Sequence, residues 1–289
     1  MLKIGFADYY LNNWHADNYP QFLREVIARF GYDARVTHAF GILDAPPQGG
    51  LTTAQWCAQR NIVPAASMDQ LVEEVDAIMV IAADNSAWHE EVCQLPLRSG
   101  KPVFVDKTFA PDLETGKRLF ELAERHGTPI FSSSAQRYCQ SILDYQAAHA
   151  QRPMFVSTVG HHSLDSYAVH QLEPIVALMG TGVKRIKGFA VGSAVTQLIL
   201  DYGEGRMANF VQSPQPWAEF NFMVSDGETG QRLISDDRNF YHNLAKAIMD
   251  FFVHGICPVQ KEETLEILAI IDAARVARIK QDVWLDIRY

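Results

Sequence analysis

The first half of the chain alternates apolar runs with stretches of helical periodicity. The runs Leu2–Ala7 and Ala77–Ala82 are almost entirely apolar, which is typical of strands buried on both faces of a parallel sheet. A helix is expected to open at Pro20 and to end at Gly31. Further strands and helices are expected at Ala34–His38, from about Trp88, at Val103–Val105, at Leu113–His126 and at Pro129–Ser133. Because parallel neighbours need crossover connections, this order predicts a doubly wound parallel sheet over residues 1–133.

The second half of the chain has a different pattern. Turn residues in Tyr202–Gly205 and Ser225–Glu228 separate strand-like segments, as antiparallel hairpins require. The expected strands are Met154–Gly160, Val183–Val191, Thr196–Tyr202, Arg206–Gln212, Ala218–Ser225 and Val283–Ile287, with helices at Phe240–Val253 and Glu262–Lys280. Residues 134–289 are therefore predicted to form a second α/β domain with a mostly antiparallel, open sheet.

The composition of the chain argues against several classes of protein. The 289 residues include 25 Lys and Arg against 34 Asp and Glu, a formal charge of −9, which argues against a nucleic-acid partner. No apolar run approaches the ~20 residues of a membrane span, and the N-terminus reads as a strand rather than a signal peptide. Cys57, Cys93, Cys139 and Cys257 lie far apart, which favours reduced thiols and a cytoplasmic protein.

A doubly wound sheet binds ligands beyond the carboxyl ends of its strands, so the loops after the apolar runs are the places for a site. A dinucleotide site is usually marked by G-x-G-x-x-G after the first strand, where glycines let the diphosphate approach helix amides. That motif is absent, since no glycine occurs between Gly5 and Gly31. Asp8 is unfavourable beside a diphosphate, and the second strand ends at His38 without an acidic residue for a ribose. The residues alone therefore do not decide whether the protein binds a nicotinamide cofactor.

Several short motifs nevertheless occur in the order of a known family. They are the helix start Ser67–Leu71, the strand Asp76–Val80, the loop residue His89, the segment Gly100–Thr108 with Asp106-Lys107, Arg137, and the helix start Ser166–Glu173 with Leu178-Met179-Gly180 beyond it. This set resembles the Gfo/Idh/MocA family of NAD(P)-dependent sugar and inositol oxidoreductases. The resemblance implies a Rossmann-like, dinucleotide-binding domain over residues 1–133 and a substrate-binding and oligomerisation domain over residues 134–289.

The resemblance also implies roles for individual residues. Lys107 would lie near the nicotinamide and hold the substrate hydroxyl, stabilising the alkoxide that develops as hydride leaves. His170 would be the general base, because its ordinary pKa lies near neutrality. Glu173, one helical turn further on, would orient the imidazole or bind a substrate hydroxyl. The implied cofactor-binding residues are Ala7, Asp8, Asn85, His89, Asp106 and Lys107, and the implied substrate-binding residues are Arg137, Ser166 and Tyr167.

Two features of the sequence depart from the family pattern. Thr108 stands where the family has a proline after a cis bond, and a cis bond before Thr costs about 2.5–4 kcal/mol. We therefore expect a trans Lys107–Thr108 bond and a shifted lysine. The bulky segment with Tyr9, Tyr10, Trp14 and His15 replaces the glycine turn; it either stacks on a ligand ring or fills the gap.

The leading hypothesis is an oxidoreductase that transfers hydride between NAD or NADP and a sugar, polyol or related carbinol. We expect a homodimer or homotetramer built through the open face of the second sheet, and no membrane partner. We expect no metal, because adjacent His161 and His162 on a strand point to opposite faces. The alternatives are a ligand-sensing homologue that has lost turnover and a cofactor-independent lyase or isomerase that uses the same acid–base groups.

Overall fold

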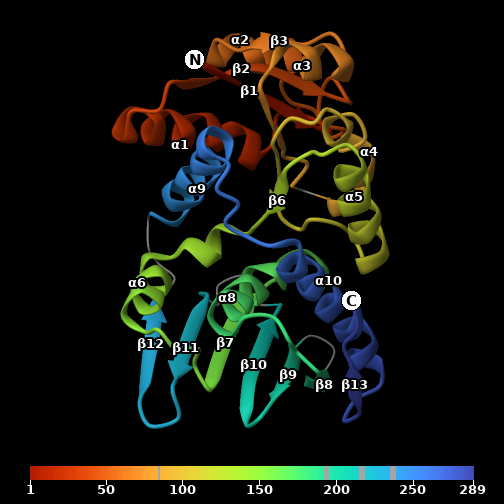
Figure 1. Ribbon diagram of the computed structural model, residues 1–289. Coiled ribbons are helices and arrows are strands. Elements are labelled where there is room, and N and C mark those ends of the chain that lie inside the picture. The colour runs from red at the N-terminus through yellow and green to blue at the C-terminus, as the bar shows by residue number, and fades with distance from the viewer. Residues whose placement is uncertain (84, 192–194, 215–218, 235–238) are drawn as a thin grey trace. The chain divides into compact units, whose positions relative to one another are not determined.

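The computed structural model describes residues 1–289 except 84, 192–194, 215–218 and 235–238 (Figure 1). The chain divides into two compact units. Unit 1 contains Met1–Ala110, Glu114–Ser133 and Leu244–Gln260, and unit 2 contains Pro111–Leu113, Ser134–Asn243 and Lys261–Tyr289. Residues 244–260 group with unit 1. The division into domains 1–133 and 134–289 stays a prediction.

Unit 1 is built on a six-stranded parallel sheet in the order β3-β2-β1-β4-β5-β6. Its elements are β1 (Leu2–Asp8), α1 (Trp14–Phe30), β2 (Ala34–Gly41), α2 (Thr53–Arg60), β3 (Val63–Pro64), α3 (Met68–Glu74), β4 (Ala77–Val80), η1 (Ser86–Trp88), α4 (His89–Val92), η2 (Pro96–Arg98), β5 (Val103–Val105), α5 (Leu113–Arg125) and β6 (Ile130–Ser132). The Rossmann-like parallel sheet predicted from the apolar runs is confirmed. The strand order reverses between β1 and β4, and the topology therefore points to the carboxyl ends of these two strands as the ligand position.

Helix α1 begins earlier than the sequence predicted. Asn13 is its N-cap, since the Asn13 side chain accepts a hydrogen bond from the Ala16 amide, and Pro20 lies inside the helix. The prediction of a start at Pro20 is wrong. The Asn13 side chain accepts a hydrogen bond from a backbone amide at the helix end, whereas a proline side chain has no acceptor for such a bond. As a result, the connection from β1 to α1 is short and consists of Tyr9–Asn13.

The segment 244–260 returns to unit 1 through aromatic and polar contacts. It includes most of α9 (Phe240–His254), and the Phe251 ring packs edge-on against Phe131 of β6, with 4.9 Å between centroids. The Tyr32 hydroxyl donates a hydrogen bond to Asp250. These contacts explain why a helix that follows the second sheet in the sequence belongs to the first unit.

Unit 2 is built on a seven-stranded sheet in the order β12-β11-β7-β10-β9-β8-β13. Its elements are η3 (Ala135–Tyr138), α6 (Gln140–Ala148), β7 (Phe155–His161), α7 (Leu164–Tyr167), α8 (Val169–Met179), β8 (Arg185–Val191), β9 (Val195–Gly203), β10 (Arg206–Ser213), β11 (Asn221–Ser225), β12 (Gly230–Ile234), α10 (Lys261–Ile279) and β13 (Trp284–Asp286). Among the described strands of this sheet, only β7 and β10 pair in parallel, which confirms the mostly antiparallel sheet.

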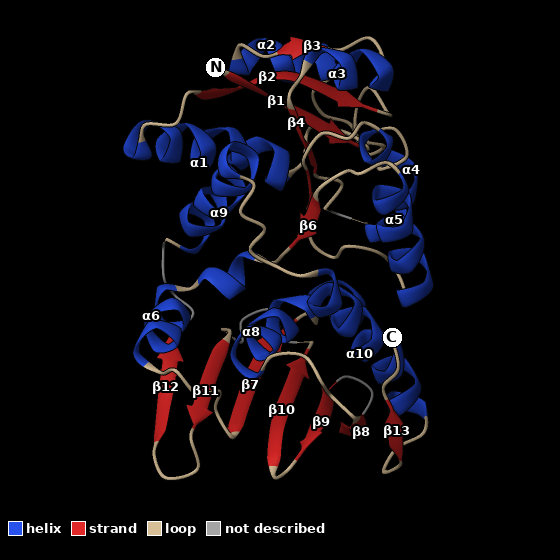
Figure 2. Cartoon of the chain, viewed as in Figure 1, coloured by secondary structure: helices blue, strands red, loops and turns tan. Residues whose placement is uncertain are grey.

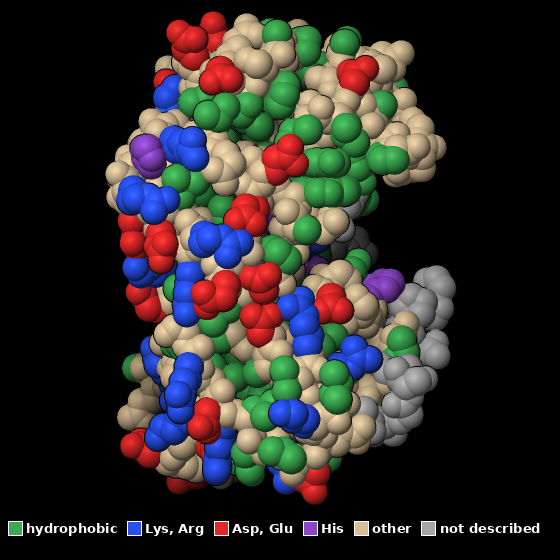
Figure 3. Space-filling model, turned by 90° about the vertical axis from the view of Figure 1, so that its right-hand side faces the viewer, with side chains coloured by type: hydrophobic (Ala, Val, Ile, Leu, Met, Phe, Trp, Pro, Cys, Tyr) green, Lys and Arg blue, Asp and Glu red, His purple; other side chains and the backbone are tan. Residues whose placement is uncertain are grey.

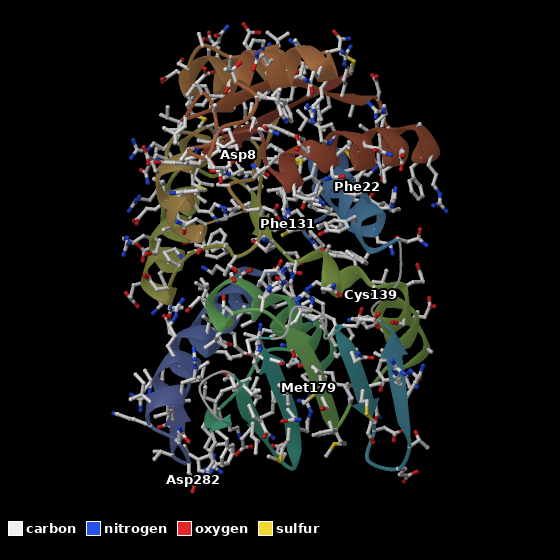
Figure 4. The ribbon with its side chains drawn as sticks, turned by 180° about the vertical axis from the view of Figure 1, so that it is seen from behind. Asp8, Phe22, Phe131, Cys139, Met179 and Asp282 are labelled. Atoms are coloured by element: carbon white, nitrogen blue, oxygen red, sulfur yellow. The ribbon has the colours of Figure 1, made fainter. Side chains whose placement is uncertain are left out.

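Helices cover one face of the second sheet, where α8 packs against β7 and α10 against β8 (Figure 2). The core between them includes Val156, Leu172, Met179 and Ile270, and Figure 4 labels Met179 together with Cys139 of the same core. Residues alternate along β7, so that Val156 and Thr158 are buried whereas Phe155 and Val159 are exposed. The face away from α8 therefore carries exposed apolar side chains, such as Phe155 and Val159.

Some predicted boundaries shift in unit 2. The strand predicted over Ala218–Ser225 starts at a residue outside the described part of the chain, and β11 begins at Asn221. The sequence did not predict β12 or α6, whose weak amphipathic pattern gave little signal. All four cysteines are free thiols in the structure.

Candidate functional site

Lys107 lies directly after β5, at the carboxyl edge of the first sheet. Its ammonium is half-buried and donates a hydrogen bond to the Ala83 carbonyl oxygen, 3.1 Å away, just beyond β4. A single cation is therefore placed beside the point where the strand order reverses. The predicted trans peptide bond is wrong, since the Lys107–Thr108 bond is cis.

The Asp106 carboxylate anchors this edge of the sheet. It is 1% exposed, and its Oδ2 lies 2.6 Å from His15 Nδ1 in the first turn of α1. Its Oδ1 accepts hydrogen bonds from the Lys107 amide at 2.8 Å and the Tyr19 hydroxyl at 3.3 Å. Burial opposes ionisation, but the charges of His15 and Lys107 and these hydrogen bonds outweigh it, so the pKa of Asp106 lies below its ordinary value. Asp106 thus ties α1 to the strand that carries Lys107.

Asp8 ends β1 and is also buried (Figure 4). Its Oδ1 accepts hydrogen bonds from the Tyr9 amide at 2.7 Å and the Ala82 amide at 3.1 Å. Its Oδ2 accepts one from Asn13 Nδ2 at 2.8 Å. This carboxylate therefore joins the ends of β1 and β4 and the cap of α1.

His89 lies in the interior rather than at an open surface. Its ring is fully buried, with Nδ1 3.0 Å from the Phe109 carbonyl oxygen and Nε2 3.2 Å from the Ile81 carbonyl oxygen. Burial lowers the pKa of His89 below its ordinary value. The ring connects the segment after β4 with the segment that follows Lys107.

The other two predicted cofactor residues of unit 1 differ in accessibility. Ala7 is fully buried in β1, and its carbonyl oxygen accepts a hydrogen bond from the Ile81 amide at 2.9 Å. Asn85 is exposed and caps η1, where its side chain accepts a hydrogen bond from the Ala87 amide. Of the six predicted residues, therefore, only Lys107 and Asn85 have side chains that reach solvent.

Tyr9, Tyr10 and Trp88 pack on one another. The Tyr9 and Trp88 rings stack with 4.2 Å between centroids and 8° between planes, and Tyr10 meets Trp88 edge-on. These contacts join the β1–α1 connection to η1. Trp14 itself is exposed. Whether this segment stacks on a ligand ring or fills the place of a glycine turn stays a prediction.

The end of β5 and the turn after β1 differ in how well they fit the parts of a nicotinamide dinucleotide. The end of β5 offers a cation, Lys107, to a polar ligand. The first turn offers no glycine, its Asn13 side chain already caps α1, and the buried carboxylate of Asp8 already accepts the nearby amides. The first turn therefore does not fit a diphosphate bound in the usual way.

Unit 2 contains the second predicted group, on helix α8. His170 Nδ1 lies 2.7 Å from the Ser134 hydroxyl oxygen, at the cap of η3. The Tyr167 and Phe220 rings approach the imidazole at 5.0 and 5.7 Å between centroids. A serine hydroxyl can donate or accept a hydrogen bond, so this contact holds Nδ1 of His170 in place in either tautomer.

Arg137 links two acidic residues in unit 2. Its Nε is 2.6 Å from Glu173 Oε2, and its Nη2 is 2.6 Å from Glu263 Oε2. Arg137 and Glu173 are buried, and although burial opposes the charge, the two carboxylates raise the pKa of Arg137. Glu173, predicted to orient His170, is thus held by Arg137 in a buried ion-pair network.

The turn after β7 brings further polar residues to the start of α8. Gln212 Nε2 lies 2.6, 3.1 and 3.2 Å from the carbonyl oxygens of His161, His162 and Ser163, and Gln171 of α8 donates to Gln212. Both glutamine side chains are buried. They fix the turn on which the two histidines lie.

The predicted substrate residues Ser166 and Tyr167 lie on α7. Ser166 is exposed, and its hydroxyl is 2.6 Å from that of Ser163. The Tyr167 ring lies 4.3 Å from His162 and 5.4 Å from His161 between centroids. Within the described residues, no three His, Cys, Asp or Glu side chains are arranged to hold a metal ion.

Sequence reasoning missed several partners in these networks. Ser134, Gln171, Gln212 and Glu263 were not singled out, although Ser134 follows the predicted last strand directly, where site residues are expected. The glutamines carry no local signal, because their role depends on pairing between α8 and β10.

Comparison with known proteins finds a family that matches part of the chain. Residues 19–133 match the Gfo/Idh/MocA family, described as an oxidoreductase family with an NAD-binding Rossmann fold, which confirms the resemblance predicted from the motifs. The chain is also 31% identical over 116 residues to a myo-inositol dehydrogenase, Hyg17, of Streptomyces leeuwenhoekii. That match covers 40% of this chain and 34% of the relative, so the chain matches about a third of that relative's length.

Solved structures extend the likeness in fold to the whole chain. A protein described as a probable dehydrogenase from Thermotoga maritima has a TM-score of 0.81 at 13% identity, covering 99% of this chain and 98% of that one. An oxidoreductase from Agrobacterium radiobacter, described in complex with NAD⁺, L-tartaric acid and magnesium, has a TM-score of 0.77 at 12% identity, with 99% and 98% covered. At these identities the likeness concerns the fold alone.

Figure 3 shows a face on which Lys and Arg side chains are mixed with Asp and Glu side chains. None of the described helices is both long and apolar enough to span a membrane.

Proposed function

We propose that this protein is an NAD(P)-dependent dehydrogenase or reductase of a sugar, polyol or related carbinol, because residues 19–133 match the Gfo/Idh/MocA oxidoreductase family. The observation that carries the proposal is the position of Lys107, a half-buried cation at the carboxyl end of β5 beside the strand-order reversal. The similarity to a myo-inositol dehydrogenase supports a polyol as substrate.

The proposed chemistry is oxidation of a carbinol to a carbonyl compound, with the nicotinamide as hydride acceptor. Lys107 holds the substrate oxygen and stabilises the negative charge that develops there. His170 removes the hydroxyl proton. When Nδ1 donates its proton to the Ser134 oxygen, the basic lone pair lies on Nε2. Lys107 and His170 are the proposed catalytic residues.

The remaining site residues receive supporting roles. Asn85 is proposed to contact the cofactor, and Ser166 and Tyr167 to contact the substrate, because these side chains reach solvent. Ala7, Asp106 and His89 act through position, since they are buried and bonded within unit 1. Arg137 and Glu173 form a buried pair that supports the helix carrying His170.

The first experiment measures binding of NADH and NADPH to the intact protein by calorimetry, followed by a screen of polyols for cofactor reduction. We expect Lys107→Met and His170→Asn each to reduce kcat by about 10²-fold or more. Lys117→Met is the matched control, because Lys117 is partly exposed and pairs with Glu114 on α5. The double variant tests whether both groups act on one substrate, since coupled losses are not additive.

The results separate this proposal from its rivals. If neither cofactor binds at millimolar concentration, the dehydrogenase proposal fails. A ligand-sensing homologue predicts binding without cofactor reduction, and a lyase or isomerase predicts turnover without nicotinamide. The relatives described as dehydrogenases and oxidoreductases favour the enzyme over the sensor.

The open face of the second sheet is proposed to join two copies of this chain in a homodimer or homotetramer. Phe155, Val159 and Met223 are exposed apolar residues on neighbouring strands of this face. Light scattering tests this proposal. Val159→Asp is expected to produce monomers, whereas Ile279→Asp, an exposed position on α10, leaves the mass unchanged. A monomeric wild-type protein would contradict it. The cytoplasmic location and the absence of nucleic-acid or membrane partners stay predictions.

A further inference from the structure

The carboxylate of Asp8 is surrounded by hydrogen-bond donors in unit 1. It is 1% exposed and accepts from the Tyr9 amide, the Ala82 amide and Asn13 Nδ2 at 2.7, 3.1 and 2.8 Å. Three donors converging on one buried carboxylate form a satisfied anion site, in which the anion belongs to the chain itself.

The Asp8 carboxylate lies where the strand order of the first sheet reverses. In a sheet of this strand order, a dinucleotide's diphosphate lies at the switch point, on the amides of the first turn and the N-terminus of α1. Asp8 ends β1 and Ala82 follows β4, the two strands that define this point. The amides of Tyr9 and Ala82, both at the switch point, therefore already donate hydrogen bonds to a carboxylate.

The N-terminus of α1 is occupied in the same way. Asn13 accepts from the Ala16 amide with its oxygen and donates to Asp8 with its nitrogen. A second carboxylate, Asp17, lies in the first turn, where Arg60 contacts it at 2.7 Å. An approaching diphosphate would meet two carboxylates and a helix end that is already capped.

The connection between β1 and α1 is also fixed in place. The carbonyl oxygens of Asp8 and Tyr9 accept hydrogen bonds from the Ile42 and Leu43 amides at 3.1 and 2.7 Å. The Tyr9 ring stacks on Trp88, which holds the connection against η1. The amides near Asp8 are therefore held toward the carboxylate by contacts on both sides.

We propose that Asp8 is an internal substitute for a ligand phosphate and the residue that determines which part of a nicotinamide cofactor contributes to binding. This inference rests on the proposed function. The nicotinamide riboside half supplies most of the affinity, and the diphosphate supplies little or opposes binding. Removing the charge of Asp8 then favours every ligand that carries a diphosphate.

The experiment compares three ligands by calorimetry on the full chain: NAD⁺, nicotinamide riboside, which lacks the diphosphate, and ADP-ribose, which lacks the nicotinamide. For the wild-type protein we expect nicotinamide riboside to bind within about tenfold of NAD⁺, and ADP-ribose more weakly than either. ADP-ribose binding as tightly as NAD⁺ would overturn the inference. This comparison needs no variant, so it holds even where a substitution at Asp8 disturbs folding.

The variant Asp8→Asn keeps the shape of the side chain and removes its charge. We expect it to tighten binding of NAD⁺ and ADP-ribose by about tenfold, and to leave nicotinamide riboside unchanged, because it carries no diphosphate. Asp33→Asn is the matched control, since Asp33 is a highly exposed carboxylate of the same unit. Weaker NAD⁺ binding by a folded Asp8→Asn protein would contradict the inference.

The two proposals fail in different ways. If wild type and Asp8→Asn bind no nicotinamide ligand, but Asp8→Asn alone binds ADP-ribose, the proposed function fails. The affinity assigned to the nicotinamide riboside half fails with it, and only the role of Asp8 as a substitute for a ligand phosphate stands. If NAD⁺ binds to the wild type and Asp8→Asn does not change its Kd, the proposed function stands and the inference fails. If no ligand binds to either protein, both fail.

Discussion

His15 Nδ1 lies 2.6 Å from Asp106 Oδ2, which joins the first turn of α1 to the end of β5. Asp106 is buried, and although burial opposes its charge, His15 and Lys107 lower its pKa. A carboxylate whose pKa is lower in the folded chain stabilises the fold above its ordinary pKa of about 4, and this contribution is lost as pH falls below that value.

Asp106→Asn is therefore expected to reduce the free energy of unfolding at neutral pH by about 3 kcal/mol, because it leaves His15 without its charged partner. Urea unfolding of the intact chain measures this change. The acid sensitivity below about pH 4 is expected to weaken in the variant. Asp286→Asn is the control, since Asp286 is exposed and 3.9 Å from Arg288. Equal losses at the two positions would contradict a special role for the buried pair.

His89 gives a second pH dependence, of a different origin. Its pKa is lowered by burial, whereas the unfolded chain has the ordinary histidine value of about 6.5. The unfolded state then binds more protons below that pH, so the folded state loses up to about 1.4 kcal/mol per pH unit as pH falls below about 6.5.

His89→Leu is expected to remove this slope, and to lower stability at neutral pH by about 1–3 kcal/mol, because the Phe109 or Ile81 carbonyl oxygen loses its donor. Unfolding curves between neutral pH and about pH 5 test both effects. His126→Leu serves for comparison, since His126 is exposed on the surface of unit 1. A slope unchanged in His89→Leu would show that another group titrates.

Sequence patterns predicted the strands of the two sheets better than the hydrogen bonds and ion pairs between side chains. The strand Ala77–Val80 is readable because a strand buried on both faces must be apolar, and Lys107 is placed by the strand that precedes it. The start of α1 was misread because Pro20 is a stronger local signal than the cap Asn13. The pairs Tyr19–Asp106 and Arg137–Glu263 lie 87 and 126 residues apart, so no local pattern could reveal them.

Arg137 is the residue whose removal should cost most in unit 2. It is buried between Glu173 and Glu263, at 2.6 Å from each. Arg137→Met removes a buried cation that contacts both carboxylates, and we expect the free energy of unfolding to fall by about 3–5 kcal/mol. Arg185→Met is the control, because Arg185 pairs with Asp201 at the surface and its loss should cost about 1 kcal/mol or less.

A second substitution separates charge from packing at Arg137. In Arg137→Met/Glu173→Gln one of the two carboxylates is neutral, so part of the lost stability is expected to return, and the two changes are not additive. Urea unfolding of both variants and of Glu173→Gln alone measures the coupling. If Arg137→Met is as stable as wild type but loses substrate affinity, the arginine contacts substrate directly, as the sequence first suggested, and the ion-pair network is secondary to that role.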